Sequence, residues 1–180
     1  MERDLSLRIA LADADRRDEL ADVAARTFPL ACPPTSAAAD VAAFIDEHLS
    51  PARFAHYLSD PDRAVFTATR DDRIIGYAVT IRGVPADPDV EAAVRTRPTV
   101  ELWKMYVLPE AHGTGAAAAL MTAALDHART LSAASVWLGV NQRNARAQRF
   151  YGKHGFAVTG TKTSRVGAVL EADYVMVRPL

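Results

Sequence analysis

The segment His112-Gly113-Thr114-Gly115-Ala116-Ala117 lies between an apolar, strand-like run at 100–108 and an alanine-rich, helix-like run at 116–131. A glycine turn that opens a helix leaves several backbone N–H groups free at the positive end of the helix dipole. Gly113 and Gly115 lack a Cβ atom, so the backbone can bend sharply and approach an anion closely. The segment therefore predicts a phosphate- or pyrophosphate-binding turn. The alternative is an ordinary helix start that binds no ligand.

The residues on either side of this turn predict an alternation of strands and helices. Apolar alternation and turn residues indicate strands at 5–10, 65–69, 73–81, 100–108, 136–140, 156–166 and 174–178. Helical spacing indicates helices at 13–28, 41–49, 51–58, 116–131 and 144–154, with a longer connection at 83–98. This interleaving is typical of one mixed α/β domain, and no linker or repeat divides residues 1–180.

Composition excludes several classes of protein. The chain has 180 residues, 49% of them hydrophobic, which suffices for one sizeable core. Cys32 is the only cysteine, so neither a disulfide framework nor a thiolate metal cluster is expected. No run resembles a signal peptide or a membrane span, which favours a cytoplasmic protein without a membrane partner. The pI of about 6.5 and the lack of a binding motif argue against nucleic acid.

The charge is unevenly distributed, although the net charge is only −1. Residues 127–170 contain no Asp or Glu but carry the basic residues Arg129, Arg143, Arg146, Arg149, Lys153, Lys162 and Arg165. A basic stretch beside an acidic one suggests an anionic ligand at one end of the molecule, the alternative being a solvated basic face.

A second block follows about thirty residues after the glycine turn. It matches the pattern N-x-x-A-x-x-F-Y-x-x-x-G-F through Asn144, Ala147, Phe150, Tyr151, Gly155 and Phe156. Together with the turn, which is similar to the loop Q/R-x-x-G-x-G/A, this block resembles the GNAT superfamily of N-acetyltransferases. The resemblance is close over residues 65–156. It implies a GNAT-like mixed, mostly antiparallel central sheet flanked by helices, with acetyl-CoA as co-substrate and no metal.

The glycine turn also matches, formally, the dinucleotide-binding pattern G-x-G-x-x-G/A. That pattern needs its first glycine directly after a strand and an acidic residue about 20 positions later. Here five residues separate Val107 from Gly113, and no acid stands near Asn141. We therefore set a dinucleotide site aside.

The resemblance also assigns residues to acetyl-CoA. It implies that the strand residues Met105, Tyr106 and Val107 offer backbone groups to the pantetheine arm. The pyrophosphate would lie on the backbone of His112, Gly113, Thr114, Gly115, Ala116 and Ala117. His112 stands where the family usually has Arg or Gln, and its side chain is expected to be exposed. Asn144 resembles a CoA-contacting residue and also fits a helix N-cap.

Acetyl transfer to an amine requires a base and an acid. A lysine-like amine has a pKa near ~10.4 and must lose a proton, while the departing CoA thiolate needs one. Tyr151 resembles the family's thiol-side acid, the alternative being core packing. Glu101 is the candidate base, the alternative being a plain strand carboxylate or a partner of a basic residue, and Asp173 is the second candidate. A covalent route through Cys32 is not expected, because no histidine base can be placed beside it.

The sequence leaves the acceptor open. Polyamine acetyltransferases show the nearest resemblance in overall layout, which favours a small amine or polyamine. The alternatives are a protein N-terminus or lysine side chain and, from another class, an acyl-CoA-binding module with little catalysis. A closed acidic pocket would favour a small amine and an open groove a peptide. The sequence also does not decide whether the protein forms a homodimer.

Overall fold

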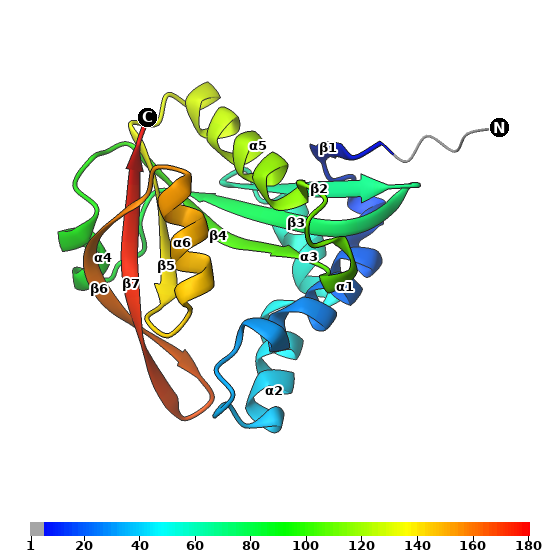
Figure 1. Cartoon of the computed structure of the whole chain (residues 1–180), viewed down its shortest axis with the longest axis horizontal. Helices are drawn as coiled ribbons and strands as arrows, with labels where there is room; N and C mark the ends of the chain where they lie inside the picture. Colours follow the sequence, from blue (N-terminus) through cyan, green and yellow to red (C-terminus); the bar gives the residue numbers. More distant parts are fainter. Residues whose placement is uncertain (1–5) are drawn as a thin grey trace.

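A seven-stranded sheet forms the centre of the computed structural model, which describes residues 6–180 (Figure 1). The strand order is β1-β2-β3-β4-β5-β7-β6, and every neighbouring pair is antiparallel except β4 and β5. The strands are β1 Arg8–Leu11, β2 Arg63–Arg70, β3 Arg73–Arg82, β4 Thr99–Val107, β5 Ser135–Asn141, β6 Ala157–Val166 and β7 Val169–Pro179. The predicted α/β fold with a mixed, mostly antiparallel sheet is confirmed.

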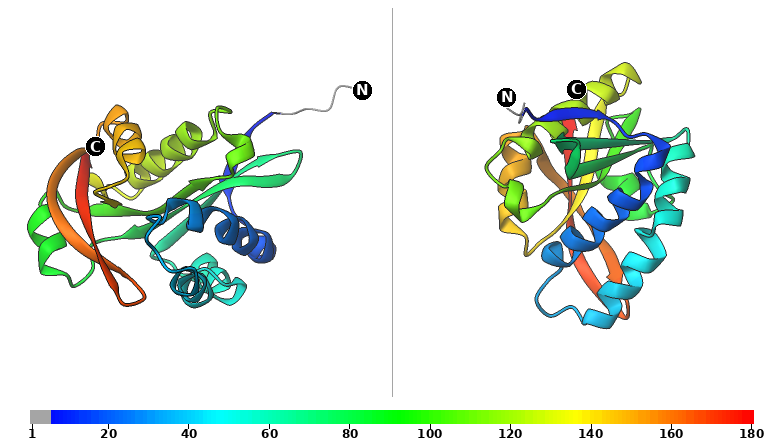
Figure 2. Two further views of the ribbon diagram at one scale, coloured as in Figure 1. Left: turned by 60° about the horizontal axis from the view of Figure 1, so that its bottom comes forward. Right: turned by 90° about the vertical axis from the view of Figure 1, so that its right-hand side faces the viewer.

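Helices cover both faces of the sheet (Figure 2). They are α1 Arg17–Ala31, α2 Ala38–His48, α3 Pro51–Ser59, α4 Pro88–Ala93, α5 Ala116–Thr130 and α6 Ala145–Lys153, with short 3-10 turns η1 Ala14–Arg16 and η2 Pro109–Ala111. Helices α5 and α6 lie on one face, and α1 to α4 lie on the other. This arrangement gives the sheet one apolar cluster on the α5 side and two on the opposite side.

Each apolar cluster follows from side-chain spacing. On α5, Leu120 and Met121 are fully buried against the sheet, and small alanines between them and the helix start let the helix lie close to the strands. On the opposite face, Leu20 of α1 and Phe54 of α3 are fully buried. The sheet is packed between these two layers of helices, which hold its central strands in place.

Most strand bounds agree with the sequence prediction within two residues, but helices α1 and α4 and the strands at the two ends of the chain differ. Helix α1 spans Arg17–Ala31 and not 13–28, and α4 lies within the expected connection at 83–98. Strand β7 begins five residues before the expected 174, because Gly167 has a φ of 63° and makes a tight turn that lets β6 and β7 pair out to the tip. Strand β1 ends at Leu11 instead of residue 10, and the expected start at Leu5 lies outside the described residues.

The central feature for function is the separation of β4 from β5. The two strands pair only at Thr99–Glu101 and Ser135–Trp137, after which β4 continues along β3 and β5 continues along β7. Figure 1 shows the two strands diverging. One edge of β4, from residue 102 to residue 107, therefore has no strand partner and keeps unpaired backbone groups.

Candidate active site

Two cavities meet along the free edge of β4. The first, here called the loop cleft, has a volume of about 480 Å³ and is bounded by β4, the segment 111–118 and α6. The second, here called the inner cavity, has a volume of about 380 Å³ and is bounded by β4, the end of α1, α2 and strands β5 to β7. Both cavities are lined by Ala31, Met105, Tyr106, Asn144, Ala147 and Tyr151.

The glycine turn forms one wall of the loop cleft. Gly113 and Gly115 have φ angles of 81° and 84°, which L side chains rarely adopt, and Cβ atoms at these positions would meet nothing within 4 Å. Helix α5 begins directly after Gly115, and its first N–H, that of Ala116, donates to the Thr114 hydroxyl at 3.4 Å. Within the part of the chain that the structure describes, the N–H groups of Gly113 and Gly115 donate to no partner. The turn thus presents open space and free N–H donors together.

The other residues of the turn hold it in shape. The Thr114 hydroxyl donates to the Ala111 carbonyl at 2.6 Å. The His112 N–H donates to the Pro109 carbonyl at 3.1 Å, so this N–H is already occupied. The His112 side chain is exposed, and its Nε2 atom lies 3.3 Å from the Val107 carbonyl oxygen. His112 therefore lies in the turn but is bonded differently from the two glycines.

The free edge of β4 forms the opposite wall of the loop cleft. Met105, Tyr106 and Val107 all line it, and they lie beyond the last residue of β4 that pairs with β5. An extended ligand can therefore run along this edge in the manner of an added strand.

Helix α6 supplies two residues at the junction of the cavities. Asn144 caps the helix, because its Oδ1 atom accepts from the Ala147 N–H at 3.1 Å, which confirms the N-cap prediction. Tyr151 lies with its ring 6.0 Å from the Phe156 ring, centroid to centroid. The Tyr151 hydroxyl makes no hydrogen bond within residues 6–180, and burial raises its pKa to about 12. The phenol is therefore protonated at physiological pH.

The inner cavity contains Glu101, the predicted base. This carboxylate forms no hydrogen bond or ion pair with another described residue. Burial raises the pKa of Glu101 to about 7, and the attraction of Lys162, Lys104 and Arg63 only partly opposes that shift. Glu101 is thus a carboxylate that can exchange a proton near neutral pH.

The other acidic residues of the inner cavity already have partners. Asp173, the second candidate base, is 7% exposed and forms an ion pair with Lys162, with Oδ2 and Nζ 3.4 Å apart. The Glu171 carboxylate accepts from Asn141 Nδ2 at 3.3 Å. Glu101 is therefore the acid of this cavity with the least engaged carboxylate.

Lys104 enters the inner cavity because of a β-bulge. Val79 of β3 pairs with Lys104, but the next residue, Thr80, pairs with Leu102, so Trp103 is an extra residue in β4. The bulge puts Trp103 and Lys104 on the same face of the sheet, toward α1 and α2. Simple alternation along the strand would have put Lys104 on the α5 face with Leu102.

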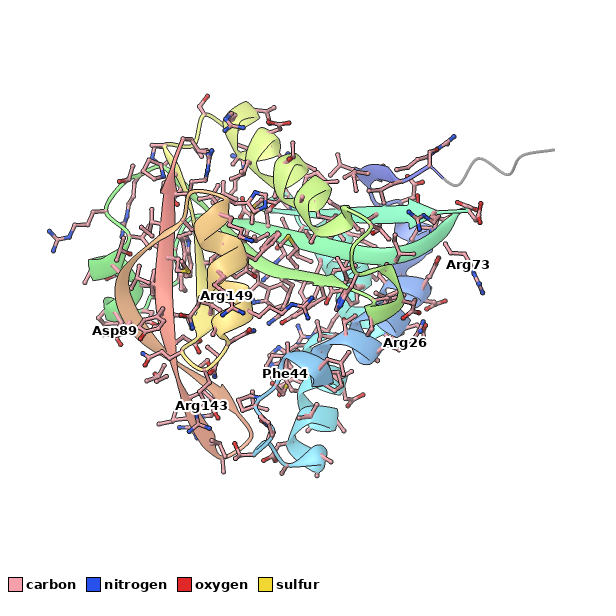
Figure 3. All side chains as sticks on the ribbon, viewed as in Figure 1. Arg26, Phe44, Arg73, Asp89, Arg143 and Arg149 are labelled. Atoms are coloured by element: carbon pink, nitrogen blue, oxygen red, sulfur yellow. The ribbon has the colours of Figure 1, made fainter. Side chains whose placement is uncertain are left out.

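Three aromatic rings surround the Lys104 ammonium. Its Nζ atom lies 5.0 Å from the Trp103 ring centroid, 5.4 Å from that of Phe44 and 5.6 Å from that of Phe28. Phe44, labelled on α2 in Figure 3, stacks on Phe28 with ring centroids 4.5 Å apart. Burial lowers the pKa of Lys104 to about 8, with Glu101 acting in the opposite direction.

Cys32 also lies in the inner cavity, which its sequence position did not reveal. Its Sγ atom is 3.4 Å from the Phe28 carbonyl oxygen, and burial raises the pKa of the thiol. A thiol held in the protonated form is a poor nucleophile, in agreement with the expectation that no covalent route uses it.

The basic stretch separates into residues near the cavities and residues away from them. Arg146 lines the loop cleft, and Lys162 and Arg165 line the inner cavity. Figure 3 shows Arg143 in the turn after β5 and Arg149 on α6, both exposed and lining neither cavity. Part of this stretch is thus a solvated face.

Sequence reasoning did not select Lys104, Lys162 and Glu171 as site residues. A lysine inside the otherwise apolar run 100–108 was a usable indication that Lys104 faces a cavity. Lys162 lies on β6, which alternates exposed and half-buried residues around it, and Glu171 lies near the start of β7; nothing local marks either residue.

Neither a metal site nor a membrane span is found in the described chain. No group of three or more His, Cys, Asp or Glu side chains within residues 6–180 is arranged to hold a metal ion. None of the helices in the same range is long and apolar enough to cross a bilayer.

Comparison with known proteins places the site in context. Residues 20–156 match the model of the acetyltransferase (GNAT) family. An uncharacterized N-acetyltransferase of Mycobacterium tuberculosis (strain ATCC 25618 / H37Rv) is 58% identical over 163 residues, 91% of this chain and 97% of that protein. A mycothiol acetyltransferase of Parafrankia sp. is 37% identical over 98 residues, 51% of this chain and 30% of that protein.

A solved structure has a similar fold. The PaiA N-acetyltransferase of Thermoplasma acidophilum, in complex with coenzyme A, has a TM-score of 0.76 and 18% identity, covering 97% of this chain and 99% of that one. At this identity the similarity concerns the fold alone.

Proposed function

This chain belongs to the acetyltransferase (GNAT) family, and from that membership we propose that it transfers an acetyl group directly from acetyl-CoA to the amine of a small acceptor. It is an acetyl-CoA-dependent N-acetyltransferase, and what we add is the direct route and the acceptor class. The observation that carries the proposal is the position of Tyr151, which lines both cavities where the loop cleft meets the inner cavity containing Glu101.

We assign acetyl-CoA to the loop cleft. Free N–H groups at Gly113 and Gly115, with the start of α5 behind them, suit the pyrophosphate, and the open Cβ positions leave room for it. Thr114, Ala116, Ala117 and the backbone of His112 complete this turn. The unpaired edge formed by Met105, Tyr106 and Val107 suits the amide groups of the pantetheine arm. Asn144, already a helix cap, keeps its Nδ2 group for the same ligand.

We assign the base to Glu101 and the acid to Tyr151. In the proposed reaction Glu101 removes a proton from the acceptor's ammonium group, directly or through water, and the neutral nitrogen attacks the thioester carbonyl. The new C–N bond forms, the C–S bond breaks, and the Tyr151 hydroxyl gives its proton to the departing sulfur. The nitrogen then loses its second proton to the Tyr151 phenolate, which restores the phenol, and Glu101 returns its proton to solvent. The pKa of Glu101 near 7 and the pKa of Tyr151 near 12 suit a base and an acid at neutral pH.

A small acceptor is favoured by the size of the inner cavity, about 380 Å³. Strand β6 contacts α2, and the tip of the β6–β7 hairpin at Gly167 lies directly against the Asp40 side chain of that helix. The hairpin and the helix thus contact each other beside the inner cavity, which residues of both line. Transfer to a protein N-terminus or lysine needs an open groove and is the second candidate.

The test is release of CoA thiol from acetyl-CoA across a panel of small amines, polyamines, peptides and aminoglycoside antibiotics. Amine-dependent release with small amines supports the proposal, and release with peptides alone supports the second candidate. Tight acetyl-CoA binding without release for any amine would leave an acyl-CoA-binding module. The cytoplasmic location and the homodimer stay predictions.

A further inference from the structure

The inner cavity contains a set of charges that do not cancel in pairs. Asp173 is matched by Lys162, and Glu171 is held by Asn141. Two half-buried groups on β4 that line the cavity have no such partner: within the described residues, neither Glu101 nor Lys104 makes a hydrogen bond or an ion pair.

An ammonium that is half-buried without an ion-pair partner is unfavourable for the fold. Removing a charge from water without pairing it costs several kcal/mol, and an apolar residue of similar length would pack better among three aromatic rings. The ring faces around Lys104 Nζ recover only part of that cost, about 0.5–2 kcal/mol per cation–π contact. Even with its pKa lowered to about 8, Lys104 is mostly protonated at neutral pH. A ligand anion would supply the missing partner.

We propose that the acceptor is a free amino acid, whose carboxylate pairs with Lys104 while its amine faces Glu101 and Tyr151. The proposal rests on the function proposed above and names the substrate class for the same site. The β4 bulge places Glu101 and Lys104 on one face of one strand, so a ligand with adjacent positive and negative groups matches both.

Charge also distinguishes a free amino acid from a polyamine and from a phosphate dianion as the ligand of this cavity. A polyamine could pair with the Glu101 carboxylate but would leave Lys104 without an anionic partner. A phosphate dianion would require more than one unpaired cation in the buried part of the cavity, where Lys162 is already paired with Asp173. A singly charged carboxylate fits one free ammonium.

The first experiment measures thiol release with matched acceptors. The panel contains the twenty L-amino acids, their carboxamides, and the decarboxylated amines isoamylamine, phenethylamine and cadaverine. For the preferred amino acid we expect kcat/KM to exceed that of its amide by about tenfold or more, as for loss of a charged hydrogen bond. Amides or decarboxylated amines that react as well as the acids would overturn the proposal.

Variants of Lys104 test the assignment. Lys104→Met keeps the length but removes the charge, and Lys104→Gln keeps a polar end. In both we expect the preference for acid over amide to disappear, mainly through a higher KM with kcat nearly held. The control Lys153→Met removes an exposed lysine of α6 that lines neither cavity and should keep the preference. A preference that survives in both Lys104 variants rejects the assignment.

A binding measurement separates this proposal from the proposed function. With CoA present, N-acetyl amino acids should raise the melting temperature of the wild type more than N-acetyl amino amides do, and Lys104→Met should lose that difference. If no amine is acetylated but the carboxylate-dependent shift remains, the proposed function fails and the carboxylate site stands. If amines are acetylated without any such shift or acid preference, the function stands and the carboxylate site fails.

Discussion

At the scale of single residues, Tyr151 and Glu101 have environments that suit the proposed chemistry. Both are half-buried, and burial raises both pKa values, but the consequences are opposite. For the phenol, the shift to about 12 keeps the proton on at neutral pH. For the carboxyl, the shift to about 7 brings its titration to neutral pH, where it can take a proton and lose it again.

Tyr151→Phe removes only the hydroxyl. Because that hydroxyl forms no hydrogen bond within the described chain, the melting temperature and the affinity for acetyl-CoA should hardly change. Turnover should fall by about 10²-fold or more if the phenol protonates the sulfur. Steady-state kinetics of the variant measure this, and Tyr174→Phe, on β7 and outside both cavities, is the control. Near-normal turnover would return Tyr151 to a packing role.

Glu101→Gln is expected to change the pH profile. In the wild type, kcat/KM should rise with pH through about 7 as the Glu101 carboxylate forms. The variant should lose most activity near neutral pH, and the loss should shrink toward the acceptor's own pKa, where the neutral amine arrives unaided. A pH-independent loss confined to KM would leave Glu101 a binding role only. The control is Glu171→Gln, because the Glu171 carboxylate of the wild type is already bonded to Asn141. This variant should keep the rise of kcat/KM near pH 7.

The same substitution has a predictable effect on stability. The folded-state pKa of Glu101 is raised above its ordinary value, so the native state binds the proton more tightly than the unfolded state. Stability from this group is therefore greatest below the unfolded pKa and is lost as pH rises through about 7. Glu101→Gln should unfold at an equal or higher temperature than the wild type at about pH 8, which thermal denaturation checks. A large loss of stability there would mean that the carboxylate is paired.

At the scale of elements, the turn before α5 and the cap of α6 carry the cofactor assignment. Gly115→Asp places a side chain and a negative charge where we assign the pyrophosphate, so the stabilisation by acetyl-CoA should disappear. The control is Gly83→Asp, at a glycine with nearly the same φ, 83°, and equally open surroundings, but outside both cavities. Both variants share the backbone strain. Only Gly115→Asp should lose the thermal shift, and a retained shift would refute the loop assignment.

Asn144→Ala tests the double role of the cap. Loss of the bond from Asn144 to the Ala147 N–H should cost about 0.5–2 kcal/mol of stability. Asn144→Asp keeps an oxygen acceptor for the cap but loses the Nδ2 donor and adds a negative charge. If the Nδ2 group contacts CoA, the aspartate variant should be stable but bind acetyl-CoA more weakly, by calorimetry. Equal affinity with an intact cap would restrict Asn144 to the helix.

At the scale of the whole molecule, every apolar cluster packs against the same sheet. Because the clusters on its two faces share the same strands, we expect residues 6–180 to unfold in a single cooperative step. Trp103 packs with the α1–α3 cluster and Trp137 with the α4 cluster, so they report on different regions. In Trp103→Phe and Trp137→Phe, the remaining tryptophan's fluorescence and the far-UV circular dichroism should give the same urea midpoint. Separate midpoints within one variant would indicate two domains.

The local parts of the fold were open to prediction from sequence because they depend on neighbours in the chain. The glycine turn and the Asn144 cap each require particular residues at adjacent positions, and the structure has both. The periodicity of 116–131 similarly fixed α5, since Leu120 and Met121 recur on the face that packs on the sheet.

The composition of the inner cavity was decided by tertiary structure alone. Glu101, Lys104 and Cys32 come from β4 and the end of α1, and Lys162, Glu171 and Asp173 come from the last hairpin, so only the closing of the sheet brings them together. The bulge at Trp103 reverses the side of the sheet that Lys104 faces, and alternation in the sequence cannot show where one extra residue is inserted. The sequence indicated the fold through its resemblance to a known family, and it determined the glycine turn because that turn depends on neighbouring residues. Burial and the pairing of distant charges determined which ionisable groups are left free to meet an acceptor.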